Sequence, residues 1–377
     1  MNNYALSHTQ ICNALVAQSM NPVKDKKRRT ILVEGRMGWG KSSILHMLAE
    51  RLPNHLPCYF DCTTKDLGDI TIPDLRQMDD GSGFVRYLTN EELGIHTNKP
   101  VILMLDEWGK CNPAVLNATL RIVQEGKIGS YTLHPDSVVF CTTNLAAEGV
   151  GDRLLAHQHD RVTTVELANP TPSEWVEWGY NNNIHTTVLA WVNGNEKIFA
   201  DFRDLEDPEE NPYIPHPRSS RKHGVTGRSL EAGSGWLHLS DQFDEPTLMS
   251  LLIGTIGNAA AGDLMTFAKL AGDLPSIDSI RTDPHGAKVP VTAAAQMMVI
   301  YRVMDVLNDP QMIDPWFAYM MRLPRETQTV FVSRCRQLSS DLKLHPKAAK
   351  LKNRILQNRV YTDWAVENNY LFTADKV

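Results

Sequence analysis

The stretch that decides the fold reads Thr30-Ile31-Leu32-Val33-Glu34-Gly35-Arg36-Met37-Gly38-Trp39-Gly40-Lys41-Ser42. Its first five residues are mostly apolar and β-branched, which predicts a strand buried in a parallel sheet. Glycines follow at once, and apolar residues then recur at helical spacing between positions 44 and 52. A strand, a glycine-rich turn and a helix in direct succession form the frame of a phosphate-binding loop.

Residues 35–42 fit the pattern G-x-x-x-x-G-K-[ST] within that frame. Glycines allow the backbone N–H groups to turn toward phosphate oxygens, and the helix N-terminus adds partial positive charge. Lys41 should reach the β- and γ-phosphates, and Ser42 should place its hydroxyl on Mg²⁺. Trp39 is bulky for this loop, and the sequence leaves open whether it stacks near the nucleotide or packs outward. We expect ATP to contact Gly35, Arg36, Met37, Gly38, Trp39, Gly40, Lys41, Ser42, Ser43.

An acidic pair, Asp106-Glu107, ends a second apolar run that begins at Val101. Ligands of open α/β sheets bind at the carboxyl ends of the strands, so this pair should lie beside the loop. We expect Asp106 to hold Mg²⁺ through water and Glu107 to polarise the attacking water. The pair favours hydrolysis over transfer to a specific acceptor, and the alternative is a solvated Asp-Glu at a strand end.

A third apolar run, residues 137–143, ends in Asn144. An asparagine at a strand end is often only a turn residue. Beside Asp106, however, its amide could contact the γ-phosphate or the attacking water. We therefore predict a catalytic role for Asn144, with Glu107 and Lys41.

Further apolar runs at 57–62 and 162–167 and a helical pattern at 113–125 alternate along the chain. This alternation predicts an α/β fold, a P-loop NTPase parallel sheet flanked by helices. A small hairpin is expected within 126–135. After Pro170 the pattern becomes helical, at 172–192 and again from 226, with an acidic, proline-containing loop at 201–217 between. We predict an N-terminal helix and basic linker (1–29), an α/β domain (30–170), an α-helical lid (171–275) and a helical C-terminal extension (276–377).

Composition narrows the class of protein. A chain of 377 residues exceeds one compact core, so we expect at least two domains. A net charge of −6 argues against a protein that coats nucleic acid by charge alone. The sequence contains no run of about 18 apolar residues, which a membrane-spanning helix would need. We therefore expect no membrane partner. Six scattered cysteines indicate a reducing, cytoplasmic compartment.

The ordered set of motifs resembles the AAA+ ATPases, with Asn144 in the place of their "sensor 1" residue. The sequence is similar, more narrowly, to the MoxR-type branch over about residues 28–240. This narrower resemblance rests on three stretches, Asp106-Glu107-Trp108-Gly109-Lys110-Cys111-Asn112-Pro113, Glu125-Gly126-Lys127-Ile128 and Thr226-Gly227-Arg228-Ser229-Leu230-Glu231.

The resemblance implies a ring homo-oligomer, usually a hexamer, with ATP at the subunit interfaces. Arg161 then resembles the arginine finger, which stabilises phosphate charge in a neighbouring subunit, and Arg153 is the competing candidate. Arg228 resembles the "sensor 2" arginine of the lid, with Arg218 as its rival. Insertions that line the pore in relatives would correspond to residues 126–135 and 64–90.

We therefore expect an ATPase that remodels a protein partner, as a chaperone does. In the family that client is often a protein with a von Willebrand factor A domain. The alternative is a nucleic-acid motor or loader, which would use a basic C-terminal segment, residues 334–359, to contact phosphates. That segment contains Arg334, Arg336, Lys343, Lys347, Lys350, Lys352, Arg354, Arg359. Its other reading is a solvated helical face.

Overall fold

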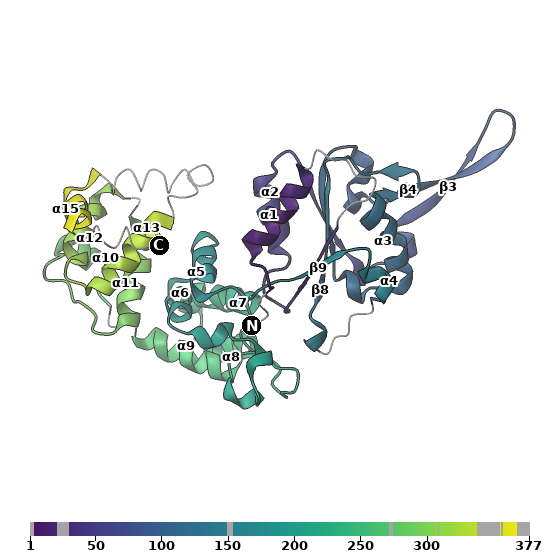
Figure 1. Cartoon of the computed structure of the whole chain (residues 1–377). Coiled ribbons are helices and arrows are strands. Elements are labelled where there is room, and N and C mark those ends of the chain that lie inside the picture. Colours follow the sequence, from purple (N-terminus) through teal and green to yellow (C-terminus); the bar gives the residue numbers. More distant parts are fainter. Residues whose placement is uncertain are drawn as a thin grey trace. The chain divides into compact units, whose positions relative to one another are not determined.

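A computed structural model describes residues 4–20, 30–148, 154–270, 274–307, 309–337, 355 and 357–367. The chain divides into two compact units (Figure 1). Unit 1 contains residues 1–171 and 199–229, and unit 2 contains residues 172–198 and 230–377. The basic linker 21–29, Arg153 and most of the basic segment 334–359 lie outside the described residues. The four-part domain division drawn from the sequence stays a prediction.

Unit 1 contains a five-stranded parallel sheet, in which the strand before the phosphate loop lies between β8 and β9. The strands are β1 Ile31–Gly35, β2 Leu56–Asp61, β5 Val101–Asp106, β8 Val138–Asn144 and β9 Thr163–Glu166, in the order β2-β5-β8-β1-β9. Gly35 pairs with Asn144 in register, and Asp61 pairs with Asp106. The predicted fold class is confirmed, and the register brings the functional ends of three strands to one edge.

Helices cover both faces of this sheet (Figure 1). They are α1 His8–Ser19 and α2 Ser43–Arg51 on one face, and α3 Pro113–Glu125 and the short α4 Ala156–His159 on the other. Alternate strand residues face alternate sides. Ile102 and Met104 pack in the core that contains α1 and α2 residues, whereas Leu103 and Leu105 pack in the core that contains α3 residues.

Helix α3 has the bounds that its sequence predicts, 113–125, because both ends carry clear signals. The Asn112 side chain accepts a hydrogen bond from the Ala114 N–H, and Pro113 occupies the first turn, where no partner for its nitrogen is needed. Gly126 ends the helix with φ +64°. The predicted hairpin follows at once as β6 Lys127–Ile128 and β7 Tyr131–Thr132.

A second hairpin, β3 Thr71–Gln77 and β4 Gly83–Thr89, extends beyond the body of unit 1 (Figure 1). It lies in the segment 64–90, for which the sequence indicated only an insertion. Ile72, Leu75 and Phe84 are at least half exposed on it. The 3₁₀ helices of unit 1 before the β8 strand are Cys62–Thr64, Leu67–Asp69, Glu91–Leu93, Ile95–Thr97 and Trp108–Lys110.

Residues 199–229, here called the return segment, belong to unit 1, although the residues just before them, 172–198, belong to unit 2. They contain the 3₁₀ helices Phe202–Asp204 and Pro208–Glu210. Arg203 fixes the segment to the sheet, because its Nη2 lies 2.6 Å from Glu166 Oε1 and 2.6 Å from Asp201 Oδ2. Arg221 closes the acidic loop by an ion pair of 2.8 Å with Glu209.

Unit 2 is helical in the part that the structure describes. Its helices are α5 Pro172–Asn181, α6 Thr186–Asn193, α7 Gly227–His238, α8 Glu245–Ile256, α9 Asn258–Leu270, α10 Ile277–Thr282, α11 Ala293–Val306, α12 Ile313–Met320, α13 Arg325–Gln337 and α15 Arg359–Glu367. The helical pattern expected over 172–192 forms two helices rather than one. It breaks at Asn183, which has φ +56°, and restarts where the His185 ring accepts a hydrogen bond from the Thr187 N–H.

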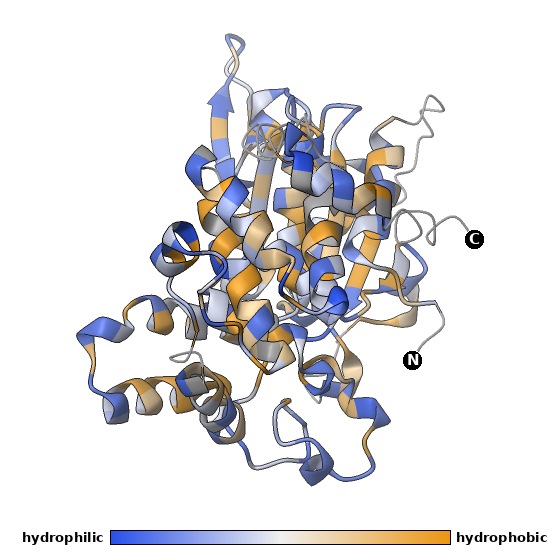
Figure 2. Ribbon diagram, turned by 90° about the vertical axis from the view of Figure 1, so that its left-hand side faces the viewer, coloured by the Kyte–Doolittle hydropathy of each residue, from blue (hydrophilic) through white to orange (hydrophobic). Residues whose placement is uncertain are grey.

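Aromatic side chains contact one another in the core formed by α11, α12, α13 and α15. Trp316 packs edge-on against Phe331, and Phe317 contacts both Phe331 and Tyr361. Figure 2 shows the helices banded in apolar and hydrophilic residues, as expected for elements with one buried side. Among the described residues, no helix is both long and apolar enough to cross a membrane.

Candidate active site

The phosphate loop depends on two glycines with positive φ. Gly38 has φ +76° and Gly40 has φ +83°. A Cβ added at Gly38 would lie 2.7 Å from the Thr226 hydroxyl oxygen, and one at Gly40 would lie 3.0 Å from His8 Nε2. Both positions therefore need glycine for backbone conformation and for space.

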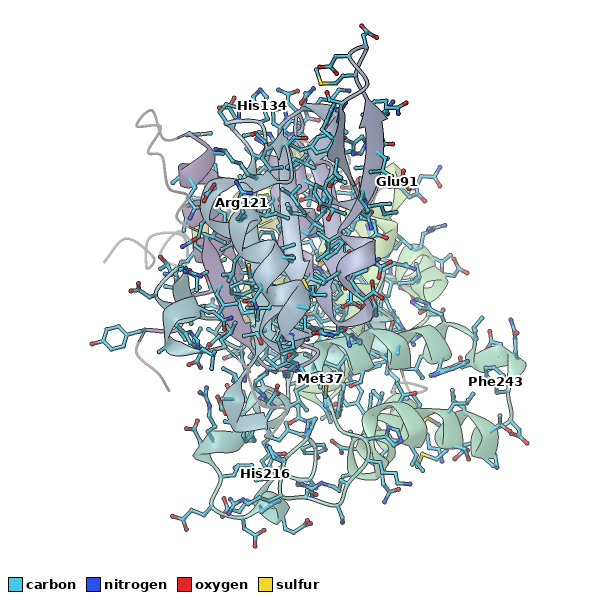
Figure 3. All side chains as sticks on the ribbon, turned by 90° about the vertical axis from the view of Figure 1, so that its right-hand side faces the viewer. Met37, Glu91, Arg121, His134, His216 and Phe243 are labelled. Carbon is cyan, nitrogen blue, oxygen red and sulfur yellow. The ribbon has the colours of Figure 1, made fainter. Side chains whose placement is uncertain are left out.

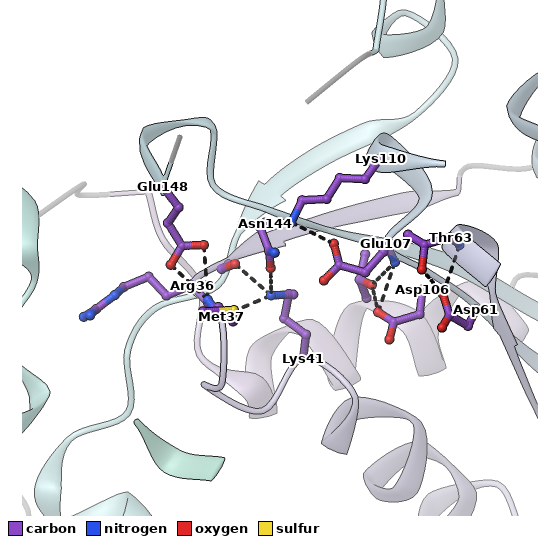
Figure 4. Close-up of polar contacts among 12 residues, drawn as sticks. Arg36, Met37, Lys41, Asp61, Thr63, Asp106, Glu107, Lys110, Asn144 and Glu148 are labelled. Carbon is purple, nitrogen blue, oxygen red and sulfur yellow. Dashed lines mark hydrogen bonds and ion pairs between the residues drawn. The ribbon is translucent and has the colours of Figure 1, made fainter. Parts of the chain in front are cut away.

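Lys41 projects into this loop, where the backbone holds its ammonium group. Its Nζ donates hydrogen bonds to Gly35 O at 2.9 Å, Arg36 O at 3.2 Å and Asn144 Oδ1 at 2.5 Å (Figure 4). Burial lowers the pKa of Lys41 below its ordinary value, while the nearby carboxylates of Glu107, Glu148 and Asp106 raise it. The loop thus presents a buried cation surrounded by oxygen atoms.

Asp106 is held from both neighbouring strands. On one side the Tyr59 hydroxyl donates to Oδ2 at 2.8 Å, and on the other the Thr142 hydroxyl donates to Oδ1. Partial burial, together with this hydrogen bond to Asp106, raises the pKa of the Tyr59 phenol well above its ordinary value. Because Tyr59 stays protonated, it remains a donor, and the Asp106 carboxylate is fixed as an acceptor.

Glu107 adopts a left-handed backbone conformation with φ +51° and ψ +33°. Such a conformation is uncommon for a residue with a side chain, and it clusters at functional sites. The turn ends the strand abruptly, and the Glu107 N–H donates to the Thr142 hydroxyl oxygen at 3.2 Å. Its Oε2 forms an ion pair of 3.2 Å with Lys110 Nζ. The position of the Glu107 side chain is therefore set by the conformation of its own backbone.

Asn144 lies beside the phosphate loop because β8 pairs with β1. Its side-chain oxygen accepts from Lys41, which leaves the amide nitrogen to serve as a donor. Figure 4 shows Lys41, Asn144, Asp106 and Glu107 together. The structure thus brings the four residues proposed for the chemistry from the ends of two adjacent strands and from the loop to one place, although their roles stay predictions.

Ser42 and Ser43 occupy the start of α2. Ser42 is the residue that precedes the helix, and the Ser43 hydroxyl donates to Gly40 O at 2.6 Å. Hydroxyl and carboxylate oxygens are ligands that Mg²⁺ prefers, so Ser42 and Asp106 suit that ion chemically. Among the described residues, no group of three or more histidine, cysteine or acidic side chains forms a dedicated metal cage. The donor set fits an ion that also takes ligands from phosphate and water.

Trp39 is buried and does not pack outward, one of the two possibilities that the sequence left open. It is 3% exposed, and its ring centroid lies 5.2 Å from that of Phe199 in the return segment. The Arg36 guanidinium lies over the rings of Trp39 and Phe202 and donates to Ala200 O at 2.9 Å. Burial lowers the pKa of Arg36. The loop residues between the glycines therefore bind the return segment.

The four candidate arginines differ in their surroundings. Arg161 is exposed in the turn before β9, and Arg153 lies outside the described residues. The Arg228 side chain is exposed, and its backbone N–H donates to Gly38 O at 3.0 Å, so its backbone abuts the phosphate loop. Arg218 instead donates from Nη2 to Glu206 O at 2.9 Å within the return segment. This geometry favours Arg228 over Arg218 as the arginine next to the loop.

Three residues of the site were missed from the sequence, Tyr59, Thr142 and Glu148. Tyr59 and Thr142 bond Asp106 from neighbouring strands, and Glu148 accepts from the Met37 N–H in the loop. For Thr142 a signal existed, since it lies two residues before Asn144 on an apolar strand that should have no polar side chain without a partner. Tyr59 and Glu148 offered no such signal.

No protein-family model matches the sequence, and a search of curated proteins found no match. Among solved structures, the chain is similar to two single-residue mutants of RuvB from Thermotoga maritima. One has 15% identity and a TM-score of 0.35 over 76% of this chain and 79% of that chain. The other has 13% identity and a TM-score of 0.32 over 97% and 91%. These similarities concern the fold alone.

Proposed function

We propose that this protein is an ATPase of the AAA+ type, which hydrolyses ATP to ADP and phosphate. One observation carries the proposal: Lys41, Asn144, Asp106 and Glu107 meet at the carboxyl edge of one parallel sheet (Figure 4). A lysine held in a phosphate loop binds nucleotide. An adjacent Asp-Glu pair goes further, since it supplies both an acid for the metal and a base for water.

Binding would begin at the loop. Its glycine-bearing backbone surrounds phosphate oxygens, and the Lys41 ammonium neutralises their charge in a site where burial strengthens the attraction. Asp106 and Ser42 would hold Mg²⁺, which when bound neutralises charge on the β- and γ-phosphates. Tyr59 and Thr142 keep the Asp106 carboxylate in a fixed orientation for that task.

Hydrolysis would then depend on Glu107. Its carboxylate accepts a proton from the attacking water, and the turn at φ +51° directs it away from the strand. Lys110 Nζ lies 3.2 Å from the same carboxylate and helps to fix its position. The Asn144 amide would donate to the γ-phosphate or to the water, because its oxygen is engaged by Lys41.

For the whole protein we propose a MoxR-like remodelling ATPase that acts on a protein client as a ring, usually a hexamer. Arg161 is exposed, as a residue that reaches a neighbouring subunit must be. The client class, a protein with a von Willebrand factor A domain, rests on the sequence resemblance.

The test is ATP turnover and ATP binding by the wild type, Lys41→Ala and Glu107→Gln, each with Mg²⁺. We expect Lys41→Ala to lose both, and Glu107→Gln to keep binding while turnover falls at least about 100-fold. Undiminished turnover in both variants would refute the proposal. The Glu107→Gln protein also serves as a trap in pull-downs for the client, and added DNA or RNA in the turnover assay tests the nucleic-acid alternative.

A further inference from the structure

An acidic side chain contacts the outer side of the phosphate loop. The Met37 N–H donates to Glu148 Oε1 at 3.0 Å and to Oε2 at 3.3 Å (Figure 4). The Met37 side chain is 54% exposed and is labelled in Figure 3. Glu148 ends the 3₁₀ helix Ala146–Glu148, four residues after Asn144. A hydrogen bond to a carboxylate is stronger than one between neutral groups.

The same peptide group is fixed at its other end by Lys41. Arg36 O accepts from Lys41 Nζ at 3.2 Å, and the N–H of that peptide group belongs to Met37. In a trans peptide the C=O and the N–H point in opposite directions. The carbonyl therefore faces the ammonium group inside the loop, and Glu148 contacts the N–H from the opposite side. If the peptide flipped, Lys41 would lose one of its oxygen partners.

The two contacts come from one short stretch of the chain, residues 144–148. Asn144, the last residue of β8, accepts from Lys41, and Glu148 accepts from Met37. Residues 144–148 thus hold the phosphate loop at two points. These are the Lys41 side chain and the Arg36–Met37 peptide, whose carbonyl faces Lys41. A loop held in this way is already arranged before a ligand arrives, and less ordering free energy is lost on binding.

We propose that Glu148 is a positioning residue: it holds the Arg36–Met37 peptide with its carbonyl toward Lys41 and so shapes the loop for phosphate. The consequence of this contact, tighter ATP binding, rests on the proposed function. The contact itself does not. The opposing effect is electrostatic, because a carboxylate near the loop repels a polyphosphate. Salt separates the two effects, since screening weakens charge repulsion between partly exposed groups and leaves a hydrogen bond in place.

The contact is tested first without nucleotide. Protein labelled with ¹⁵N-methionine gives few amide signals, and Met37→Leu identifies the one from Met37. We expect Glu148→Ala to shift this signal upfield and to raise its hydrogen-exchange rate at least about fivefold, because the acceptor is lost. Glu148→Gln, which keeps an acceptor oxygen, should stay near the wild type. Glu91→Ala removes an exposed carboxylate of the same unit and serves as the charge control (Figure 3).

The consequence is tested by ATP binding in about 0.5 M salt. We expect Glu148→Ala to weaken binding about five- to tenfold, Glu148→Gln to weaken it no more than about threefold, and Glu91→Ala to have no effect. Tighter binding by Glu148→Ala, or equal losses in the alanine and glutamine variants, would refute the positioning role. If the wild type binds no ATP, the proposed function fails, and the Met37 signal alone still decides whether Glu148 holds the loop.

Discussion

The two units bury polar side chains of different kinds. In unit 1 the buried polar groups at the sheet edge include two that carry charge, Lys41 and Asp106, which are 7% and 8% exposed. In unit 2 the buried network among α11, α13 and α15 is neutral. Thr327 donates to Gln296, and Trp364 donates to Gln328, at 2.7 and 2.6 Å.

This difference separates groups kept for chemistry from groups kept for stability. Burying a charge is costly even when it is paired, and an apolar replacement is often as stable. The charges of unit 1 are therefore poor candidates for holding the fold together. The neutral amides of unit 2 pair with a hydroxyl, an indole N–H and backbone carbonyls, and removing one amide leaves its partners without hydrogen bonds. Variants in unit 1 should then lose activity, and variants in unit 2 should lose stability.

The largest effect is expected for Glu107→Gln. Removing a general base slows a reaction about 10²- to 10⁴-fold, so turnover should fall at least about 100-fold. The thermal midpoint should change little, because glutamine has nearly the same shape and keeps an oxygen that can accept from Lys110. Turnover and melting are measured on one preparation. A large drop in melting temperature would show that Glu107 stabilises the fold. It would contradict the assignment of the charged groups of unit 1 to chemistry.

Gln328→Leu should act in the opposite way. Gln328 accepts from Trp364 Nε1 and donates to Leu323 O at 2.8 Å, so leucine leaves two buried groups unpaired. Each unpaired group costs about 1–3 kcal/mol, and we expect the free energy of unfolding to fall by about 2 kcal/mol. The loss of stability is measured as faster hydrogen exchange in peptides from α13 and α15. The control is the exposed Gln311→Leu, and an equal effect there would contradict the explanation.

Unit 2 should also lose stability in acid through His185. Burial, with His238 and Arg302 nearby, lowers the pKa of His185 from 6.5 to about 4. A histidine that is harder to protonate when folded stabilises the fold fully above pH 6.5, and this stability is lost as pH falls toward 4. We expect a loss of about 3 kcal/mol across that window. His185→Asn keeps the helix cap without titrating, so its α6 peptides should show a weaker pH dependence of exchange.

The sequence predicted much of the fold because its signals were local. The run at 101–105 is apolar throughout, and the strand 101–106 that contains it is buried along its whole length. Asn112, Pro113 and Gly126 mark both ends of α3. The hairpin of β3 and β4 was missed as strands, because Pro73 interrupts the first strand and its apolar residues do not alternate regularly.

The site was predictable where strand ends decide the position. Lys41, Asp106, Glu107 and Asn144 follow from a motif and from strands that end in polar residues. Tyr59 and Thr142 depend on sheet register, and Glu148 depends on how the chain turns after β8. Those contacts join residues more than 30 positions apart, and no local pattern encodes them.

The smallest effect is expected for a change at Thr142, which contacts both Asp106 and Glu107. The Thr142 hydroxyl donates to Asp106 and accepts from the Glu107 N–H, so Thr142→Val removes two hydrogen bonds without changing volume much. We expect turnover to fall about tenfold, which is about 1.4 kcal/mol in the barrier, with ATP affinity changed less than threefold. The maximum in turnover should also require more Mg²⁺.

Thr142→Ser restores the hydroxyl and should restore most of the turnover. Thr142 lies wholly inside the sheet, so a loss of stability must be separated from a loss of alignment. Melting curves and the serine variant do this, because serine loses a buried methyl group but keeps both hydrogen bonds. If serine is as slow as valine, packing at position 142 limits the reaction, and unit 1 would depend on apolar contacts at its site as unit 2 does in its core.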